Sequence, residues 1–143
     1  MKRIFLGAAP QLCFGFLLTF ASSIGQTFFI SLFAGEIRSE LNLSHGMFGT
    51  FYSAATLTSA LFFLWFGKFT DQFDLPLLGL IAFIALSLFS LMLANTNTLF
   101  LLFLSLLGLR FFGQGLLGHV AVTAMACWFS KKRGQALSFA ALG

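Results

Sequence analysis

Four long apolar stretches alternate with short polar segments along the chain. A membrane-spanning helix needs about 20 mostly apolar residues, because the hydrocarbon core is about 30 Å thick and a helix rises about 1.5 Å per residue. The polar segments are GEIRSELNLSHG at 35–46, GKFTDQFDLP at 67–76 and NTNT at 95–98. The pattern predicts spanning helices at about 12–34, 47–66, 77–94 and 99–128, and a fifth helix that begins at about 135.

A cleaved signal peptide is the alternative interpretation of the first stretch. Lys2 and Arg3 would form its basic region, and Ala21 would lie near the cleavage site. Residues 4–35, however, contain no Asp, Glu, Lys or Arg. This stretch is much longer than the apolar core of about 7–15 residues in a signal peptide, so a spanning helix is favoured.

The composition supports an integral membrane protein. Hydrophobic residues make up 59% of the chain and charged residues 8%, and 22 residues are phenylalanine. The mean hydropathy is +0.97. A soluble domain has about a quarter of its residues charged, which this chain does not approach. The predicted fold class is therefore an all-α membrane protein, a helical bundle with four transmembrane helices and the start of a fifth.

The basic residues predict the orientation of the bundle. With the N-terminus in the cytoplasm, the cytoplasmic side receives six basic residues and the opposite side only Arg38. Because Lys and Arg are enriched in cytoplasmic loops, this distribution predicts a cytoplasmic N-terminus. We expect a multi-pass protein of the cell membrane (inner or plasma membrane). The six cytoplasmic residues are Lys2, Arg3, Lys68, Lys131, Lys132 and Arg133.

Polar residues in the first span recur at helical spacing. Their offsets of i, i+3, i+4, i+7 and i+8 would place them on one face of a continuous helix. Such a face must contact protein or water. Helix packing through hydroxyl groups is one interpretation; we favour the lining of a cavity, because five polar groups exceed what packing requires. The residues are Thr19, Ser22, Ser23, Gln26 and Thr27.

The fourth span contains an arginine near the middle of the membrane. Arg110 is the twelfth residue of this span, about 17 Å from its outer end. An unrelieved arginine at that depth costs about 2.5–3.5 kcal/mol. Gln114 follows four residues later and would share its face. Arg110 is either a structural partner of backbone carbonyls or part of a substrate or ion pathway, which we favour. For His119 we expect a neutral hydrogen-bonded side chain rather than a proton carrier.

Motifs for catalysis or metal binding are absent from the sequence. Cys13 and Cys127 lack the neighbours of a metal or redox pair, and we expect both to be buried as small apolar residues. No HExxH motif, acidic metal-binding motif or serine nucleophile elbow occurs. We therefore expect no enzyme activity, no metal or other cofactor, and no nucleic-acid partner.

The loop after the second span resembles a motif of the major facilitator superfamily of secondary transporters. GKFTDQF is similar to that family's G-x-x-x-D-[RK]-x-G-R-[RK], and Gly67 and Asp71 match in spacing and place. Three later positions depart from the motif: Gln72, Asp74 and Leu75. The resemblance implies that Gly67 and Asp71 help to control a cytoplasmic gate. Lys68 and Arg133 are candidate partners of Asp71.

Two further stretches are similar to the same family. LGLRFFGQG resembles R-x-x-x-[QG]-G, which Arg110, Gln114 and Gly115 match. WFSKKRGQALS resembles the W-F-x-x-x-R-G-x-A segment of the monocarboxylate and oxalate–formate antiporter-like branch. The resemblance implies a cavity lined by the first and fourth helices. Because family members normally have twelve spans, it also implies that residues 1–143 are a partial N-terminal domain whose partners are the remaining helices and the lipid bilayer.

The predicted function is secondary active transport of a small solute by alternating access, and an organic anion is the solute class that we favour. Protons or a counter-anion would be coupled to it. The alternative is a four-span membrane scaffold or assembly module without transport activity of its own. A small four-span drug exporter would need a membrane-embedded glutamate in its first helix, which is missing. The predicted pathway residues are Arg110, Gln114, Gln26, Ser22, Ser23 and Thr19.

Overall fold

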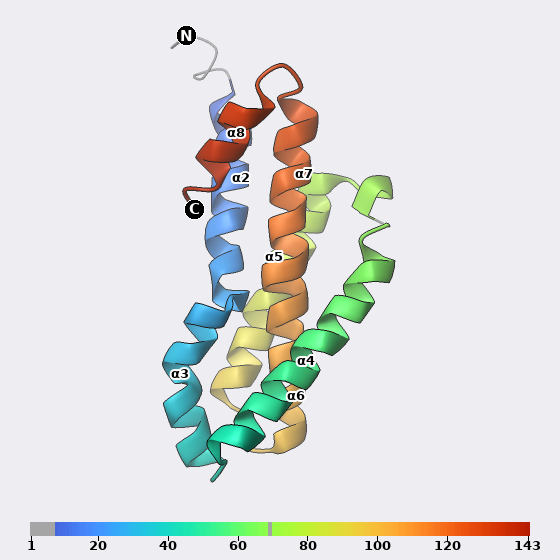
Figure 1. The fold of residues 1–143 in the computed structure, drawn as a ribbon. Helices are drawn as coiled ribbons and strands as arrows, with labels where there is room; N and C mark the ends of the chain where they lie inside the picture. Colours follow the sequence, from blue (N-terminus) through green and yellow to red (C-terminus); the bar gives the residue numbers. More distant parts are fainter. Residues whose placement is uncertain (1–7, 69) are drawn as a thin grey trace.

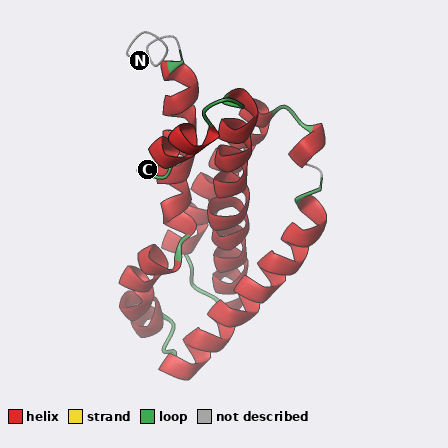
Figure 2. Cartoon of the chain, turned by 45° about the horizontal axis from the view of Figure 1, so that its top comes forward, coloured by secondary structure: helices red, strands yellow, loops and turns green. Residues whose placement is uncertain are grey.

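The computed structural model describes residues 8–68 and 70–143, and these form a bundle of helices without a strand (Figures 1 and 2). Lys2 and Arg3 lie outside the described residues, as does the side chain of Asp71. The predicted fold class is confirmed, because four helices are long and apolar enough to cross a membrane. They are Ala9–Glu40, His45–Phe66, Leu75–Ala94 and Leu99–Trp128.

The first span is not the continuous helix that the sequence predicted. Helix α2 (Ala9–Ser22) passes into the short 3₁₀ turn η1 (Ser23–Gly25), and α3 (Thr27–Glu40) begins after Gln26. The helix also extends beyond the expected end at residue 34. Figure 1 shows α2 and α3 as two segments that meet at an angle. The break separates the polar residues of this span into two groups.

A tight connection joins α3 to α4 (His45–Phe66). Asn42 has a positive φ of 52°, which asparagine tolerates better than most residues. The hydroxyl of Ser44 accepts a hydrogen bond from the Met47 amide at 3.1 Å and so caps α4. Across the turn, Arg38 Nη1 lies 2.8 Å from His45 Nε2. One backbone conformation and two local interactions therefore define this turn.

The third span begins and ends at turn signals present in the sequence. A turn of 3₁₀ helix, η2 (Thr70–Gln72), precedes α5 (Leu75–Ala94), which has Pro76 in its first turn. After α5, the Thr98 hydroxyl accepts a hydrogen bond from the Leu101 amide at 3.3 Å and starts the fourth span. One face of α5 packs on the fourth span, whereas many of its leucine and isoleucine side chains are exposed.

The fourth span has an irregular middle that the sequence did not predict. It consists of α6 (Leu99–Gly108), the π-helix η3 (Leu109–Leu117) and α7 (Gly118–Trp128). A π-helix is wider than an α-helix and usually occurs as a short insertion, often at functional sites. A last helix, α8 (Arg133–Ala140), starts two residues before the expected position and packs against α2 and α7.

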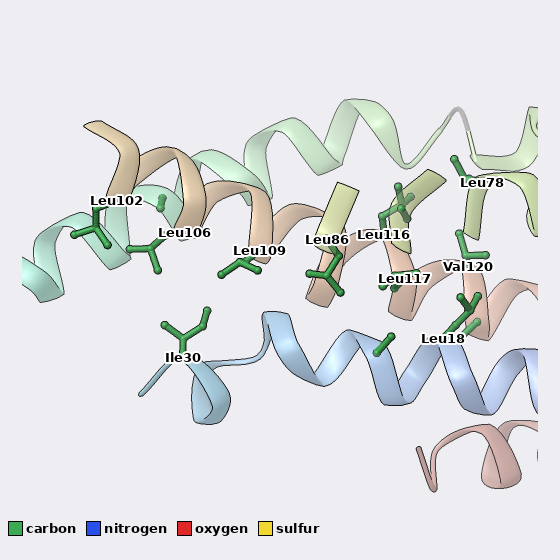
Figure 3. Close-up of a cluster of buried hydrophobic side chains, with 14 of the residues drawn as sticks. Leu18, Ile30, Leu78, Leu86, Leu102, Leu106, Leu109, Leu116, Leu117 and Val120 are labelled. Carbon is green, nitrogen blue, oxygen red and sulfur yellow. The ribbon is translucent and has the colours of Figure 1, made fainter. Parts of the chain in front are cut away.

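The fourth span is the centre of the bundle. It contacts α2, α4 and α5, and the buried side chains gather around it (Figure 3). In Figure 3, Leu86 of α5 lies between Leu109 and Leu117 of η3 in a row of side chains alongside the first span. Most of the largest fully buried side chains belong to the fourth span: Leu102, Leu106, Leu109, Leu116, Leu117, Val120 and Met125.

The two ends of the bundle differ in charge. We call one of them the basic end; it contains Lys68, Lys131, Lys132 and Arg133 together with the start of α2 and the loop before α5 (Figure 1). The opposite end contains Arg38 and also Glu36 and Glu40 at the end of α3. The orientation of these ends relative to the cell stays a prediction.

Candidate functional site at the break in the first span

The break leaves backbone groups of the first span without their helical partners. Gln26 adopts an extended conformation with φ −79° and ψ 154°, and its amide donates to the Ser23 carbonyl at 3.0 Å. Helix ends leave several carbonyl and amide groups unpaired within the helix. In a membrane such groups must find partners in the protein. The Gly25 carbonyl finds one in the fourth span.

Two glycines bring the backbones of the first and fourth spans into direct contact. A Cβ atom on Gly25 would overlap the Leu109 carbonyl oxygen and lie 2.7 Å from the Gln114 nitrogen. A Cβ atom on Gly113 would lie 2.7 Å from the Gly25 Cα. Only glycine fits at both positions without moving backbone. The contact lies where the first span is broken and the fourth span is a π-helix.

Arg110 of η3 points to this break. Its Nη1 donates hydrogen bonds to the Gly25 carbonyl oxygen and to the Thr27 Oγ1, each at 3.3 Å. Its guanidinium carbon also lies 5.5 Å from the centre of the Tyr52 ring, within range for a cation–π contact. Charge-assisted hydrogen bonds contribute about 1.5–3 kcal/mol each, and exposed cation–π contacts about 0.5–1 kcal/mol. Together these contacts can offset the cost of the charge at this depth.

Thr27 and Tyr52 complete what we call the Arg110 cluster, which consists of Arg110, Gly25, Thr27 and Tyr52. The Tyr52 hydroxyl donates to Thr27 Oγ1 at 2.8 Å. Thr27 Oγ1 thus accepts two hydrogen bonds, which leaves its own proton as a donor. Arg110 uses both Nη1 protons, and no hydrogen bond or ion pair engages its Nε or Nη2 among residues 8–68 and 70–143. The unused groups of Arg110 and Thr27 are all donors.

The structure divides the polar residues predicted on the first span. Thr19 Oγ1 donates to the Gly15 carbonyl at 3.0 Å, and Ser22 Oγ donates to the Thr19 carbonyl at 2.7 Å. Both hydroxyls are thus paired within their own helix. Ser23 and Gln26 are half-buried at the break. The prediction of one continuous polar face is wrong, because the extended backbone at Gln26 interrupts the helical periodicity that it assumed.

Gln114 does not join the Arg110 cluster. Its side chain is exposed, and no hydrogen bond connects it to a described residue of the cluster. Arg110 and Gln114 both lie in the π-helix η3, where a spacing of four residues is still close to one turn, so their shared face stays a prediction. The sequence interpretation missed Gly25 and Tyr52. The sequence did contain a signal that could have identified Tyr52. It is the one tyrosine of the chain, and its hydroxyl requires a hydrogen-bond partner in a membrane.

The loop motif lies at the basic end. Gly67 follows α4, and its amide donates to the Phe63 carbonyl at 2.8 Å, while Lys68 is exposed. The side chain of Asp71 lies outside the described residues, so the structure does not test its partners. Arg133 Nε donates to the Ala126 carbonyl at 3.0 Å. This bond satisfies a carbonyl near the end of α7, as basic residues at helix C-termini often do.

The comparison with protein families identifies the family. The model of the Major Facilitator Superfamily matches residues 15–143. The chain belongs to the major facilitator superfamily. No curated protein and no solved structure gives a significant match. Members of the major facilitator superfamily transport solutes, so this chain is an integral, multi-pass membrane protein of solute transport.

Membership in a family of membrane proteins also explains why the prediction that both cysteines are buried was wrong. Cys13 and Cys127 are both exposed on the described bundle rather than buried. The expectation of burial came from proteins in water, where a thiol behaves as a small apolar group. In a membrane the surrounding lipid is itself apolar, so little is gained by burying such a side chain in the bundle.

Proposed function

We propose that this chain forms the N-terminal helices of a secondary active transporter for a small organic anion, with Arg110 binding the carboxylate of the solute. The observation that supports this most is the set of unused donors around Arg110, near the middle of the fourth span. No ion pair neutralises its charge among the residues that the structure describes. An arginine inside a spanning helix without a counter-ion is typical of a substrate or ion pathway, and an anionic solute would supply the missing negative charge.

The geometry of the guanidinium favours a carboxylate. With Nη1 occupied, the Nε–H and Nη2–H groups form a planar edge that matches two carboxylate oxygens. The free proton of Thr27 adds a third donor. An ionised carboxylate only accepts hydrogen bonds, so it suits a site whose free groups are all donors. An amide or an ammonium group would place its own N–H donors next to the donors of the site.

The broken first span suits alternating access. Transporters commonly place their binding sites where spanning helices are interrupted near the membrane midplane. We propose that Gln26, Ser23 and Gln114 line the pathway beside the Arg110 cluster, together with Thr19 and Ser22. Because no described acidic side chain pairs with Arg110, the coupled proton would be the solute's own, or the exchange would be against a second anion. Gly67, Asp71, Lys68 and Arg133 would act at a gate on the cytoplasmic side of the plasma membrane.

Uptake into membrane vesicles tests the solute class. The probes are acetate, lactate and oxalate, each beside its neutral amide (acetamide, lactamide and oxamide), in the protein expressed from its complete gene. We expect saturable uptake of at least one carboxylate, inhibited by the other carboxylates and not by the amides. Uptake of the amides at equal rates, or inhibition by organic cations and not by carboxylates, would contradict the proposal.

A further inference from the structure

A second polar contact ties the fourth span to the loop at the basic end. His119 of α7 has its Nε2 atom 3.1 Å from Oγ1 of Thr70, the first residue of η2. Thr70 is only 1% exposed, although it belongs to a loop between two spans. The loop therefore folds back onto the fourth span at this residue.

The hydrogen bonds of Thr70 determine which atom donates in this contact. Thr70 Oγ1 also lies 2.6 Å from the Gly67 carbonyl oxygen, which can only accept. A hydroxyl has a single proton, and the proton on Thr70 goes to this carbonyl. Thr70 Oγ1 must then accept from the imidazole, so Nε2 of His119 bears a proton and is the donor.

Phe63 closes the set of contacts. The Gly67 amide donates to the Phe63 carbonyl at 2.8 Å, and the Phe63 ring packs edge-on against the His119 ring, with centroids 5.6 Å apart. The contacts thus run from α4 through Gly67 and Thr70 to His119 and back to α4. Such a closed set holds the turn more firmly than any single hydrogen bond.

We propose that His119 is a positioning residue for the turn formed by residues 67, 68 and 70–72, and that its Nε2–H bond to Thr70 sets where this turn sits on the bundle. The turn includes Gly67 and Asp71, so His119 would act on the gate through them. That effect on transport rests on the proposed function. The ordering of the turn by His119 does not, and it is measurable without any substrate.

Trypsin cleavage after Lys68 measures the ordering directly, because Lys68 is exposed and lies in the turn. The variants are His119→Leu and Thr70→Val, which each remove one partner. Their controls are His119→Gln, whose amide nitrogen can donate from a similar position, and Thr70→Ser, which keeps the hydroxyl. Cleavage after Lys131 and Lys132 at the same end serves as an internal reference for general loosening.

We expect His119→Leu to raise the rate of cleavage after Lys68 about tenfold, as loss of one hydrogen bond would. Thr70→Val also loses the bond to the Gly67 carbonyl, so its rise should be at least as large. Cleavage at the reference sites should change less than about twofold, and His119→Gln and Thr70→Ser should behave as the natural protein does. Unchanged cleavage after Lys68 overturns the proposal. So does an equal rise at every site, or a His119→Gln variant that resembles His119→Leu.

A transport assay separates this role from that of Arg110. In the transporter we expect His119→Leu to lower the maximal rate of uptake while the KM stays within about twofold, because the substitution leaves the Arg110 cluster intact. If no probe is transported by the natural protein, the proposed function fails while the cleavage result still decides the role of His119. If cleavage responds as expected but uptake does not, the turn is ordered by His119 without limiting transport, and the effect on the gate is rejected.

Discussion

Gly25→Ala is expected to destabilise the protein by about 3 kcal/mol, the upper part of the usual range for overpacking. The added methyl group would overlap the Leu109 carbonyl oxygen and lie 2.8 Å from the Gly113 Cα. These neighbours are backbone atoms, which cannot rotate away as the end of a side chain can. The first and fourth spans must then separate, and the Gly25 carbonyl would move away from Arg110.

Gly118→Ala is the matched control, since Gly118 lies in the fourth span, the other partner of this contact, and no atom approaches its added Cβ within 4 Å. There the change should stabilise the helix or leave it unaltered, because alanine favours helix over glycine by up to about 1 kcal/mol. Both variants are compared by unfolding of the purified protein in detergent mixtures. Equal stability of the two variants would contradict the close backbone contact.

Arg110→Ala is expected to reduce carboxylate uptake to the background level of vesicles without the protein. The substitution removes the planar donor edge and also leaves the Gly25 carbonyl without its Nη1 partner. Removal of an expensive charge should not impair insertion into the membrane. Uptake is therefore measured beside the amount of protein in the membrane.

Arg38→Ala is the control for a general effect of losing an arginine. Arg38 lies at the opposite end of the bundle from the basic end, where its Nε donates to the Ala34 carbonyl and its Nη1 contacts His45. This variant should keep most of the uptake. Equal loss in both variants would show that uptake fails for a reason other than the site at Arg110.

The four spans were predictable because length and apolarity are sufficient signals for a membrane helix. Turn signals such as Pro76, Ser44 and Thr98 also lie where the structure begins a helix. The place of Arg110 near the middle of the fourth span followed from simple counting. Each of these predictions depends on local sequence and on the thickness of a bilayer, and none of them requires knowledge of contacts between distant residues.

The break in the first span was not predictable, because its cause lies in another helix. Residues 23–26 read as SIGQ, which a regular helix also tolerates in a membrane. The Gly25 backbone instead packs against Gly113, which is 88 residues away in the sequence (113 − 25 = 88). The π-helix was not predictable either, since its sequence permits but does not require it.

The candidate site was predicted in part for the same reason. Arg110 followed from its charge, whereas its partners depend on the break. The Gly25 carbonyl is a backbone group, so no feature of the sequence indicates that it binds Arg110. Thr27 joins the Arg110 cluster only because the chain changes direction at Gln26. Residues placed by helical periodicity alone, such as Thr19 and Ser22, proved to be paired within their own helix.

The most direct test of the central claim is the affinity of Arg110→Lys for a carboxylate and for its neutral amide. Lysine keeps the positive charge but lacks the planar edge. For lactate, or whichever carboxylate probe is transported, we predict binding at least tenfold weaker than in the natural protein, measured by titration calorimetry, with the weak binding of the amide unchanged. Equal affinity of both proteins for the carboxylate would contradict the claim that Arg110 binds the solute through its free edge.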